Sequence, residues 1–134
     1  IRNIVDKIGS QSLVISIDAK KRSEGKWEVY VNNGRDRTGI DVIYWIKKVI
    51  DMGAGEILIT SIDCEGTRKG FDYELAKNSL KVSTIPTIIS GGCGELQHLQ
   101  KLKSLINIDA VAVADCIHYN RISIKDLKST LTSI

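Results

Sequence analysis

The sequence predicts an α/β fold: half of a (β/α)8 TIM barrel, made of four consecutive parallel βα units in one domain over residues 1–134. Short apolar runs rich in β-branched residues alternate along the chain with longer segments in which apolar residues recur at helical spacing. Continuous apolar runs are typical of parallel strands, which are buried on both faces. A full barrel has about 250 residues, so this chain of 134 residues provides half of one.

The predicted strands and helices follow one another in regular order. The strands cover residues 13–17, 57–59, 85–89 and 110–114. The helices cover residues 1–8, 41–50, 72–80 and 96–105. Ser123 and Asp126 resemble a capping box, which predicts a last helix through Leu127, Leu131 and Ile134.

A further strand is predicted between the first strand and the helix that starts at Asp41. Residues 27–31 alternate in polarity, and Glu24-Gly25 and Asn32-Asn33-Gly34 flank them. Such turn residues on both sides of a short alternating run predict a hairpin at the surface.

An open doubly wound sheet is the alternative arrangement for four parallel strands. Such a sheet usually carries its glycine fingerprint after the first strand. Here the first strand ends in Asp18-Ala19-Lys20, and the glycine pair Gly91-Gly92 follows the third. The position of the glycines favours the half-barrel.

The composition excludes several classes of protein. A content of 43% hydrophobic and 26% charged residues is ordinary for a globular domain. No apolar run approaches the roughly 18 residues that a membrane span needs, and the start lacks the pattern of a signal peptide. Three cysteines cannot all pair with each other, which favours a reducing compartment. We therefore expect a cytoplasmic protein without a membrane partner.

Polar residues gather where three of the predicted strands end. Parallel α/β proteins bind their ligands at the carboxyl ends of the strands. Thr60 and Ser90 are candidates to orient a substrate through their hydroxyls. Gly66, Gly91 and Gly92 are candidates to let the backbone approach a phosphate closely, beside the N–H groups that open the next helix. The alternative is that Ser-Gly-Gly is only a flexible turn.

Two further groups of residues have both a functional and a structural interpretation. A basic rim would attract phosphorylated ligands, although solvated loop charge is the simpler explanation, and the aromatic residues expected for nucleic-acid binding are missing. The three cysteines follow strands, with His118 nearby, but no spacing typical of zinc ligands occurs, so we expect no metal and no cofactor. We expect His98 at the surface. The rim residues are Lys20, Lys21, Arg22, Arg35 and Arg37, and the cysteines are Cys64, Cys93 and Cys116.

Four segments occur in order along the chain: VISIDAK at residues 14–20, Thr38-Gly39, GAGEILITSID at residues 53–63 with Gly66-Thr67, and Ser90-Gly91-Gly92. Together they resemble the cyclase subunit of imidazole glycerol phosphate synthase, from histidine biosynthesis. The similarity covers essentially the whole chain and corresponds to the C-terminal half of that family's barrel. The long GAGEILITSID segment also separates the chain from the related isomerase of the same pathway.

The resemblance implies an enzyme that works with a glutaminase partner. The glutaminase supplies ammonia, and the cyclase condenses it with a phosphoribulosyl formimino carboxamide ribonucleotide, giving imidazole glycerol phosphate and an aminoimidazole carboxamide ribonucleotide. Two aspartates serve as general acid and base. One falls in the N-terminal half of the barrel, and the other matches Asp18, which is thus a candidate general acid. The alternative is that Asp18 caps the following loop.

The chain departs from the family's pattern at two positions. Where the family usually has a serine that helps to hold a phosphate, the sequence reads Ala114-Asp115-Cys116. A carboxylate about 4 Å from a phosphate is repelled by about 1 kcal/mol in water and more near a protein. Either Asp115 caps the helix that follows, or the ligand has changed. Asn33, in place of a smaller hydroxyl residue, raises the same question.

Three functions remain open from the sequence. The first is the cyclase of histidine biosynthesis; the second is a paralogue that pairs with an amidotransferase to aminate surface sugars, which Asp115 favours. The third is a noncatalytic half-barrel scaffold. In either enzyme, an N-terminal half-barrel would have to supply the missing aspartate, so we expect this chain alone to be inactive. The unpaired edges of its first and last strands predict self-association.

Overall fold

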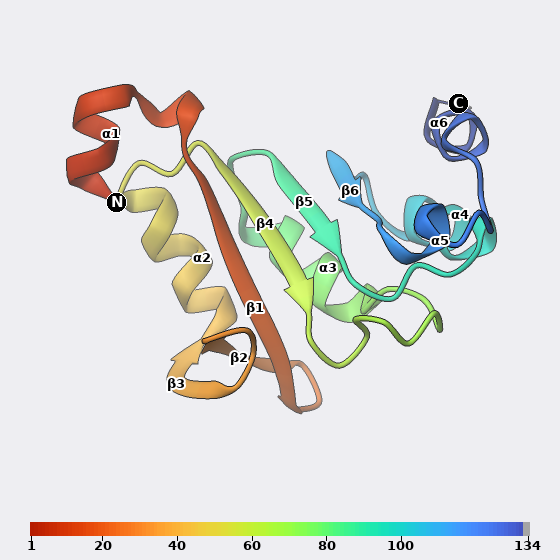
Figure 1. The fold of residues 1–134 in the computed structure, drawn as a ribbon. Coiled ribbons are helices and arrows are strands. Elements are labelled where there is room, and N and C mark those ends of the chain that lie inside the picture. Colours follow the sequence, from red (N-terminus) through yellow and green to blue (C-terminus); the bar gives the residue numbers. More distant parts are fainter. Residues whose placement is uncertain (133–134) are drawn as a thin grey trace.

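The chain folds into one six-stranded sheet with helices on its flanks, and the computed structural model describes residues 1–132 (Figure 1). Its elements are α1 (Arg2–Ile8), η1 (Ser10–Ser12), β1 (Val14–Ser23), β2 (Lys26–Val31), β3 (Asp36–Asp41), α2 (Val42–Asp51), β4 (Glu56–Ser61), α3 (Tyr73–Val82), β5 (Thr87–Ser90), α4 (Leu96–Leu105), β6 (Ala110–Ala112), α5 (Asp115–His118) and α6 (Ile124–Thr132).

The sheet has the strand order β3-β2-β1-β4-β5-β6. Strands β1, β4, β5 and β6 are parallel neighbours in the order of the sequence. A doubly wound sheet reverses its order at a switch point, whereas here each new strand is added on the same side. The prediction of four parallel βα units from half of a barrel is confirmed. The strands point towards the same group of loops, at the lower side of Figure 1.

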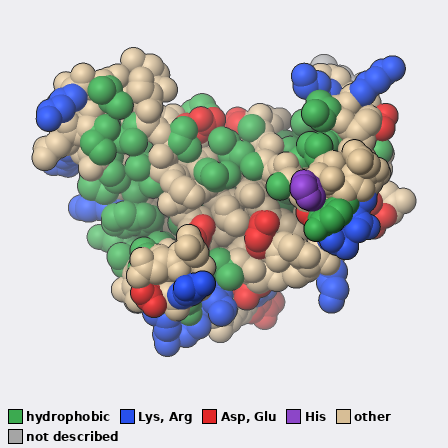
Figure 2. All heavy atoms as spheres, viewed as in Figure 1, with side chains coloured by type: hydrophobic (Ala, Val, Ile, Leu, Met, Phe, Trp, Pro, Cys, Tyr) green, Lys and Arg blue, Asp and Glu red, His purple; other side chains and the backbone are tan. Residues whose placement is uncertain are grey.

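The two faces of the parallel strands differ because successive side chains of a strand point in opposite directions. Ile17 of β1 and Ile57 and Ile59 of β4 are almost fully buried, in one core with residues of α2 and α3. On the opposite face, Val14 is exposed and Leu58 is only partly buried. Figure 2 shows hydrophobic side chains at the surface around β4 and β5 on the side seen in Figure 1. The sheet is therefore covered by helices on one face and open on the other.

The prediction of a short first strand and a surface hairpin is wrong. β1 continues to Ser23, pairs with β2 from Asp18 onwards, and β2 pairs with β3, a strand that the sequence did not reveal. Trp27 of β2 is 1% exposed, and its Nε1 donates a hydrogen bond to Asp72 Oδ2 at 2.8 Å. Asp72 also accepts from Leu75 N as the N-cap of α3. The hairpin thus packs into the core and onto the start of α3.

We expect Trp27→Ala to lower the free energy of unfolding by about 3–5 kcal/mol, as large aromatic truncations in a core do. Trp27→Phe keeps most of the apolar volume but removes the donor to Asp72, so it should cost less, about 1–3 kcal/mol. Urea unfolding followed by circular dichroism measures both. A loss below about 1 kcal/mol for the alanine variant would mean that the hairpin is not part of the cooperative core.

The remaining boundaries agree with the sequence to within a few residues. Helix α4 has the predicted bounds, and the Ser123 capping box is confirmed, because Asp126 N donates to Ser123 Oγ at 3.1 Å. The short helix α5 was not predicted, and β6 ends two residues earlier than expected. The predicted end of the last helix at Ile134 lies outside the described residues. Within residues 1–132, each helix is too short or too polar to cross a membrane.

Candidate active site

Asp18, Thr60 and Ser90 lie side by side in one row across the sheet. Asp18 of β1 is in register with Thr60 of β4, which is in register with Ser90 of β5, and Ala112 of β6 completes the row. Residues in register on neighbouring strands point to the same face, and all three polar side chains are partly exposed on the open face. Neighbouring strands are about 4.8 Å apart, so the row from Asp18 to Ser90 spans about 10 Å.

Asp18 occupies the interior of β1 and has strand neighbours on both sides, Tyr30 of β2 and Thr60 of β4. It therefore caps no turn, and that alternative is wrong. Lys20 follows on the same face of the strand, with its Nζ 5.5 Å from the centroid of the Tyr30 ring. The carboxylate of Asp18 is therefore accessible from the open face of the sheet, as a group that exchanges protons with a substrate must be.

A cavity of about 120 Å³ lies at the β5 and β6 end of this row. Five of the six residues predicted to bind substrate or phosphate line it; Thr60 lies in the row beside it. Its lining consists of Glu65, Gly66, Arg68, Ser90, Gly91, Gly92, Cys93, Ala112, Val113, Ala114 and Asp115. The structure thus brings the β4–α3 loop, the β5–α4 loop and the start of α5 together around one small space.

The glycine pair is required because the two loops touch through their backbones. Gly91 and Gly92 have φ values of 100° and 93°, in the left-handed region that favours glycine. Gly70 N donates to Gly92 O at 2.9 Å, and a Cβ on Gly92 would lie 2.1 Å from the carbonyl oxygen of Gly70. A side chain at this position would clash with the backbone of Gly70 unless the two loops moved apart.

Asp115 is held by arginine and does not cap α5. The N-cap residue is Ala114, without a side-chain cap. Arg68 Nε and Nη2 donate to Asp115 Oδ1 and Oδ2 at 2.7 and 2.9 Å, and Arg121 Nε lies 3.8 Å from Oδ1. The hydrogen bonds from Arg68 hold the pKa of Asp115 below its usual value. The alternative that Asp115 caps the following helix is wrong. Its carboxylate lines the cavity and is paired with Arg68.

Sequence reasoning missed Arg68. The residue lies in the polar loop after β4, where its only signal was a positive charge two positions after Gly66. Its partner Asp115 is 47 residues away along the chain, so only the fold brings the two together. The one signal in the sequence for this pairing is the charge of Asp115 itself, because a carboxylate at a predicted anion site needs a compensating cation.

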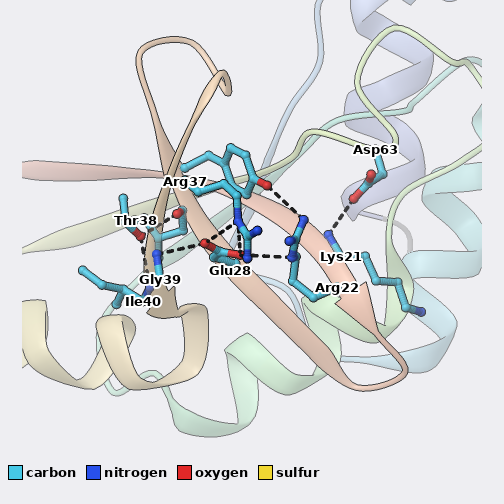
Figure 3. Close-up of polar contacts among 10 residues, drawn as sticks. Lys21, Arg22, Glu28, Arg37, Thr38, Gly39, Ile40 and Asp63 are labelled. Atoms are coloured by element: carbon cyan, nitrogen blue, oxygen red, sulfur yellow. Dashed lines mark hydrogen bonds and ion pairs between the residues drawn. The ribbon is translucent and has the colours of Figure 1, made fainter.

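Three of the five residues of the predicted basic rim are paired with carboxylates. Arg22 and Arg37 hold Glu28 at 3.0 and 3.1 Å, as Figure 3 shows, and Lys21 pairs with Glu74 at 2.8 Å. The side chain of Glu28 is only 8% exposed, and it also accepts from Gly39 N. Hydrogen bonds from Arg37 and then from that N–H lower its pKa. These charges stabilise the hairpin rather than form a free phosphate-binding rim.

His98 is not a surface residue. Its side chain is 14% exposed, and its Nδ1 accepts a hydrogen bond from Gly94 N at 3.1 Å, which orders the loop after the glycine pair. Cys93 and Cys116 are buried free thiols in one core. Burial, and then the neighbouring Cys116, raise the pKa of Cys93 to about 12. Residues 1–132 contain no group of three or more His, Cys, Asp or Glu placed to hold a metal ion.

The fold and the site define a class: a half-barrel of the (β/α)8 type with a carboxylate, two hydroxyls and a glycine-lined cavity at its strand ends. Residues 1–123 match the family described as "Histidine biosynthesis protein", and the chain belongs to that family.

Curated relatives of this chain carry the name of one subunit of imidazole glycerol phosphate synthase. The chain is 45% identical over 126 residues to "Imidazole glycerol phosphate synthase subunit HisF" of Bacillus cereus (strain Q1), and 44% identical over 126 residues to the protein of the same name from strain ATCC 10987 / NRS 248. Each comparison covers 94% of this chain and 50% of the relative. The chain thus spans about half the length of the curated relatives it matches.

Proposed function

We propose that this chain is the C-terminal half of a cyclase subunit of imidazole glycerol phosphate synthase. The complete enzyme would use glutaminase-derived ammonia to convert a phosphoribulosyl formimino carboxamide ribonucleotide to imidazole glycerol phosphate and an aminoimidazole carboxamide ribonucleotide, in the cytoplasm. The observation that carries the proposal is the row of Asp18, Thr60 and Ser90 beside a glycine-lined cavity. The 45% identity to a subunit of that name supports it.

In this proposal the cavity binds the terminal phosphate of the substrate. The backbone at Gly66, Gly91 and Gly92 lets the anion approach closely, and Ser90 adds a hydroxyl. The phosphate anchors one end of the substrate, and the chain of carbon atoms then runs along the row of side chains. Thr60 lies between the cavity and Asp18, where its hydroxyl is placed to donate a hydrogen bond to a substrate hydroxyl or to accept one from it.

Asp18 is the proposed general acid. Its place about two strand spacings, roughly 10 Å, from the cavity end of the row suits a reacting centre several bonds away from the anchored phosphate. A single carboxylate cannot both remove and return protons at opposite sides of the ring that forms. The chemistry therefore needs a second carboxylate, which in the proposed enzyme comes from an N-terminal half-barrel.

The open face and the free edges of the sheet support an N-terminal half-barrel as the partner. β2 pairs with β1 only from Asp18 onwards, so in the described residues the first part of β1 has a strand neighbour on one side alone. β6 is the last strand of the sheet. Unpaired edges and a partly apolar face favour closure with four more strands. Without that half, we propose that two copies associate through the same surfaces.

A second candidate function is amination of a surface sugar by a paralogue that pairs with another amidotransferase. Asp115 favours it, because a carboxylate at the cavity indicates a different balance of charges around the ligand. A scaffold role without catalysis is the remaining alternative. The two enzyme functions share the proposed phosphate cavity and differ in the substrate that is turned over.

The test is complementation. The purified chain is mixed with the N-terminal half of the 45% identical Bacillus cereus relative, and ammonia-dependent formation of the aminoimidazole product is followed. We expect no turnover from the chain alone and clear turnover from the mixture. Sedimentation should give a dimer or larger species for the chain alone and a one-to-one complex after mixing. A mixture that forms the complex but never turns over this substrate would contradict the histidine-pathway function, and no complex would contradict the half-barrel pairing.

A further inference from the structure

We infer that Arg68 is an exchangeable ligand of the cavity: it leaves Asp115 to bind the phosphate of the ligand, while Arg121 keeps Asp115 paired. The inference rests on the proposed phosphate-binding role of the cavity. It names Arg68 as the residue that allows a phosphate to bind beside the carboxylate of Asp115. Arg68 and Asp115 both line the cavity, from the β4–α3 loop and from the start of α5.

The first argument is electrostatic. With Asp115 unpaired, a phosphate dianion in this cavity would face a second anion, and Glu65 also lines the space. Two arginines lie next to Asp115, at 2.7 Å for Arg68 and 3.8 Å for Arg121. Asp115 with its two arginines carries one net positive charge. Such a group neutralises the carboxylate and still leaves one cation for the ligand.

The second argument is that Arg68, and not Arg121, is placed to reach a ligand in the cavity. Arg68 lines the cavity, and Arg121 does not. The Arg68 side chain is 42% exposed, and only Nε and Nη2 of its guanidinium hydrogen-bond to Asp115. A guanidinium matches two phosphate oxygens in the same forked geometry that it uses for a carboxylate. The exchange therefore replaces one pair of charge-assisted hydrogen bonds with another.

The third argument is that the backbone of Arg68 is held by its neighbours while its side chain is partly exposed. Its φ is 60°, a left-handed conformation that persists in a non-glycine residue only where neighbours impose it. Its backbone packs against Gly94, where an added Cβ would lie 2.7 Å from the Arg68 carbonyl oxygen. The Tyr119 ring contacts both guanidinium groups, with centroid distances of 5.3 Å to Arg68 and 5.7 Å to Arg121. Arg121 is thus already beside Asp115 when Arg68 turns away.

The test is titration of the chain with inorganic phosphate, followed by calorimetry at low ionic strength. We expect Arg68→Gln to weaken phosphate binding at least 10-fold and Arg68→Lys to give an intermediate loss, because lysine keeps the charge without the fork. Lys69→Gln removes the neighbouring charge, which does not line the cavity, and should change the affinity less than 2-fold. In an Asp115→Ser background, Arg68→Gln should weaken phosphate binding more than it does in the wild type, because Arg68 then binds phosphate without first giving up its hydrogen bonds to Asp115.

A second measurement needs no variant and is independent of any loss of folding. In the NMR spectrum of the wild-type chain, phosphate should shift the Nε–H resonance of Arg68 and leave that of Arg121 near its original position. Equal phosphate affinity in the wild type and Arg68→Gln would overturn the exchange while leaving the phosphate cavity in place. No phosphate binding by the wild type, Asp115→Ser or Arg68→Lys would overturn the cavity's proposed role and the inference with it.

Discussion

Asp18→Asn is expected to lower kcat of the complemented half-barrel pair at least about 100-fold, with little change in KM, because a positioned general acid contributes about 10²–10⁴ to the rate. Asparagine has nearly the same shape as aspartate but cannot release a proton. Asp18 lies in the row on the open face, and in the described residues its carboxylate makes no hydrogen bond that the change would break. The fold should therefore be unaffected, and the loss should lie in the chemical step.

Ser16→Ala is the matched control for this variant. Ser16 lies on the same strand and the same face, two residues before Asp18, where it is exposed. Loss of the Ser16 hydroxyl should change kcat less than 2-fold. Steady-state kinetics of the complemented pair, with kcat and KM determined separately for both variants, gives the measurement. Turnover of Asp18→Asn within 3-fold of the wild type would remove Asp18 from the chemistry and leave it a structural residue.

Gly92→Ala is expected to be the most damaging small substitution in the site. The new Cβ would lie 2.1 Å from the carbonyl oxygen of Gly70, and φ is 93°. A left-handed alanine costs about 1–2 kcal/mol, and forcing extra volume into a packed region adds about 1–3 kcal/mol. We therefore expect the free energy of unfolding to fall by about 2–5 kcal/mol, together with loss of phosphate binding as the two loops separate.

Gly66→Ala separates the backbone cost from the clash. Gly66 also lines the cavity and has φ 70°, but a Cβ there would meet no atom within 4 Å. Gly66→Ala should therefore lower the free energy of unfolding by only about 1–2 kcal/mol. Urea unfolding and phosphate titration of both variants measure the difference. If Gly92→Ala lowers the free energy of unfolding by no more than Gly66→Ala does, the two loops can move apart at little cost, and their contact does not hold the cavity in shape.

The sequence by itself determined the order of the four parallel strands and of the longer helices between them, and it marked the carboxyl ends of those strands as the place where chemistry is to be expected. Apolar runs such as residues 57–59 and the leucine spacing of α4 are local patterns, and hydrophobic periodicity reports local structure directly. The positions of Thr60 and Ser90 at strand ends followed from the same patterns. Parallel pairing then places such residues in one row, so the sequence alone predicts which residues form the candidate site.

Only the tertiary structure decided how the charges are shared. Arg68 and Asp115 are 47 residues apart, Glu28 is held by arginines from two other strands, and Trp27 donates a hydrogen bond to Asp72, which lies 45 residues away. Nothing in the local sequence distinguishes these residues from solvated loop charge or a surface hairpin, because their partners are set by packing between distant segments. A long-range pair is chosen by the fold as a whole, which is why the paired state of Asp115 could be found only in three dimensions.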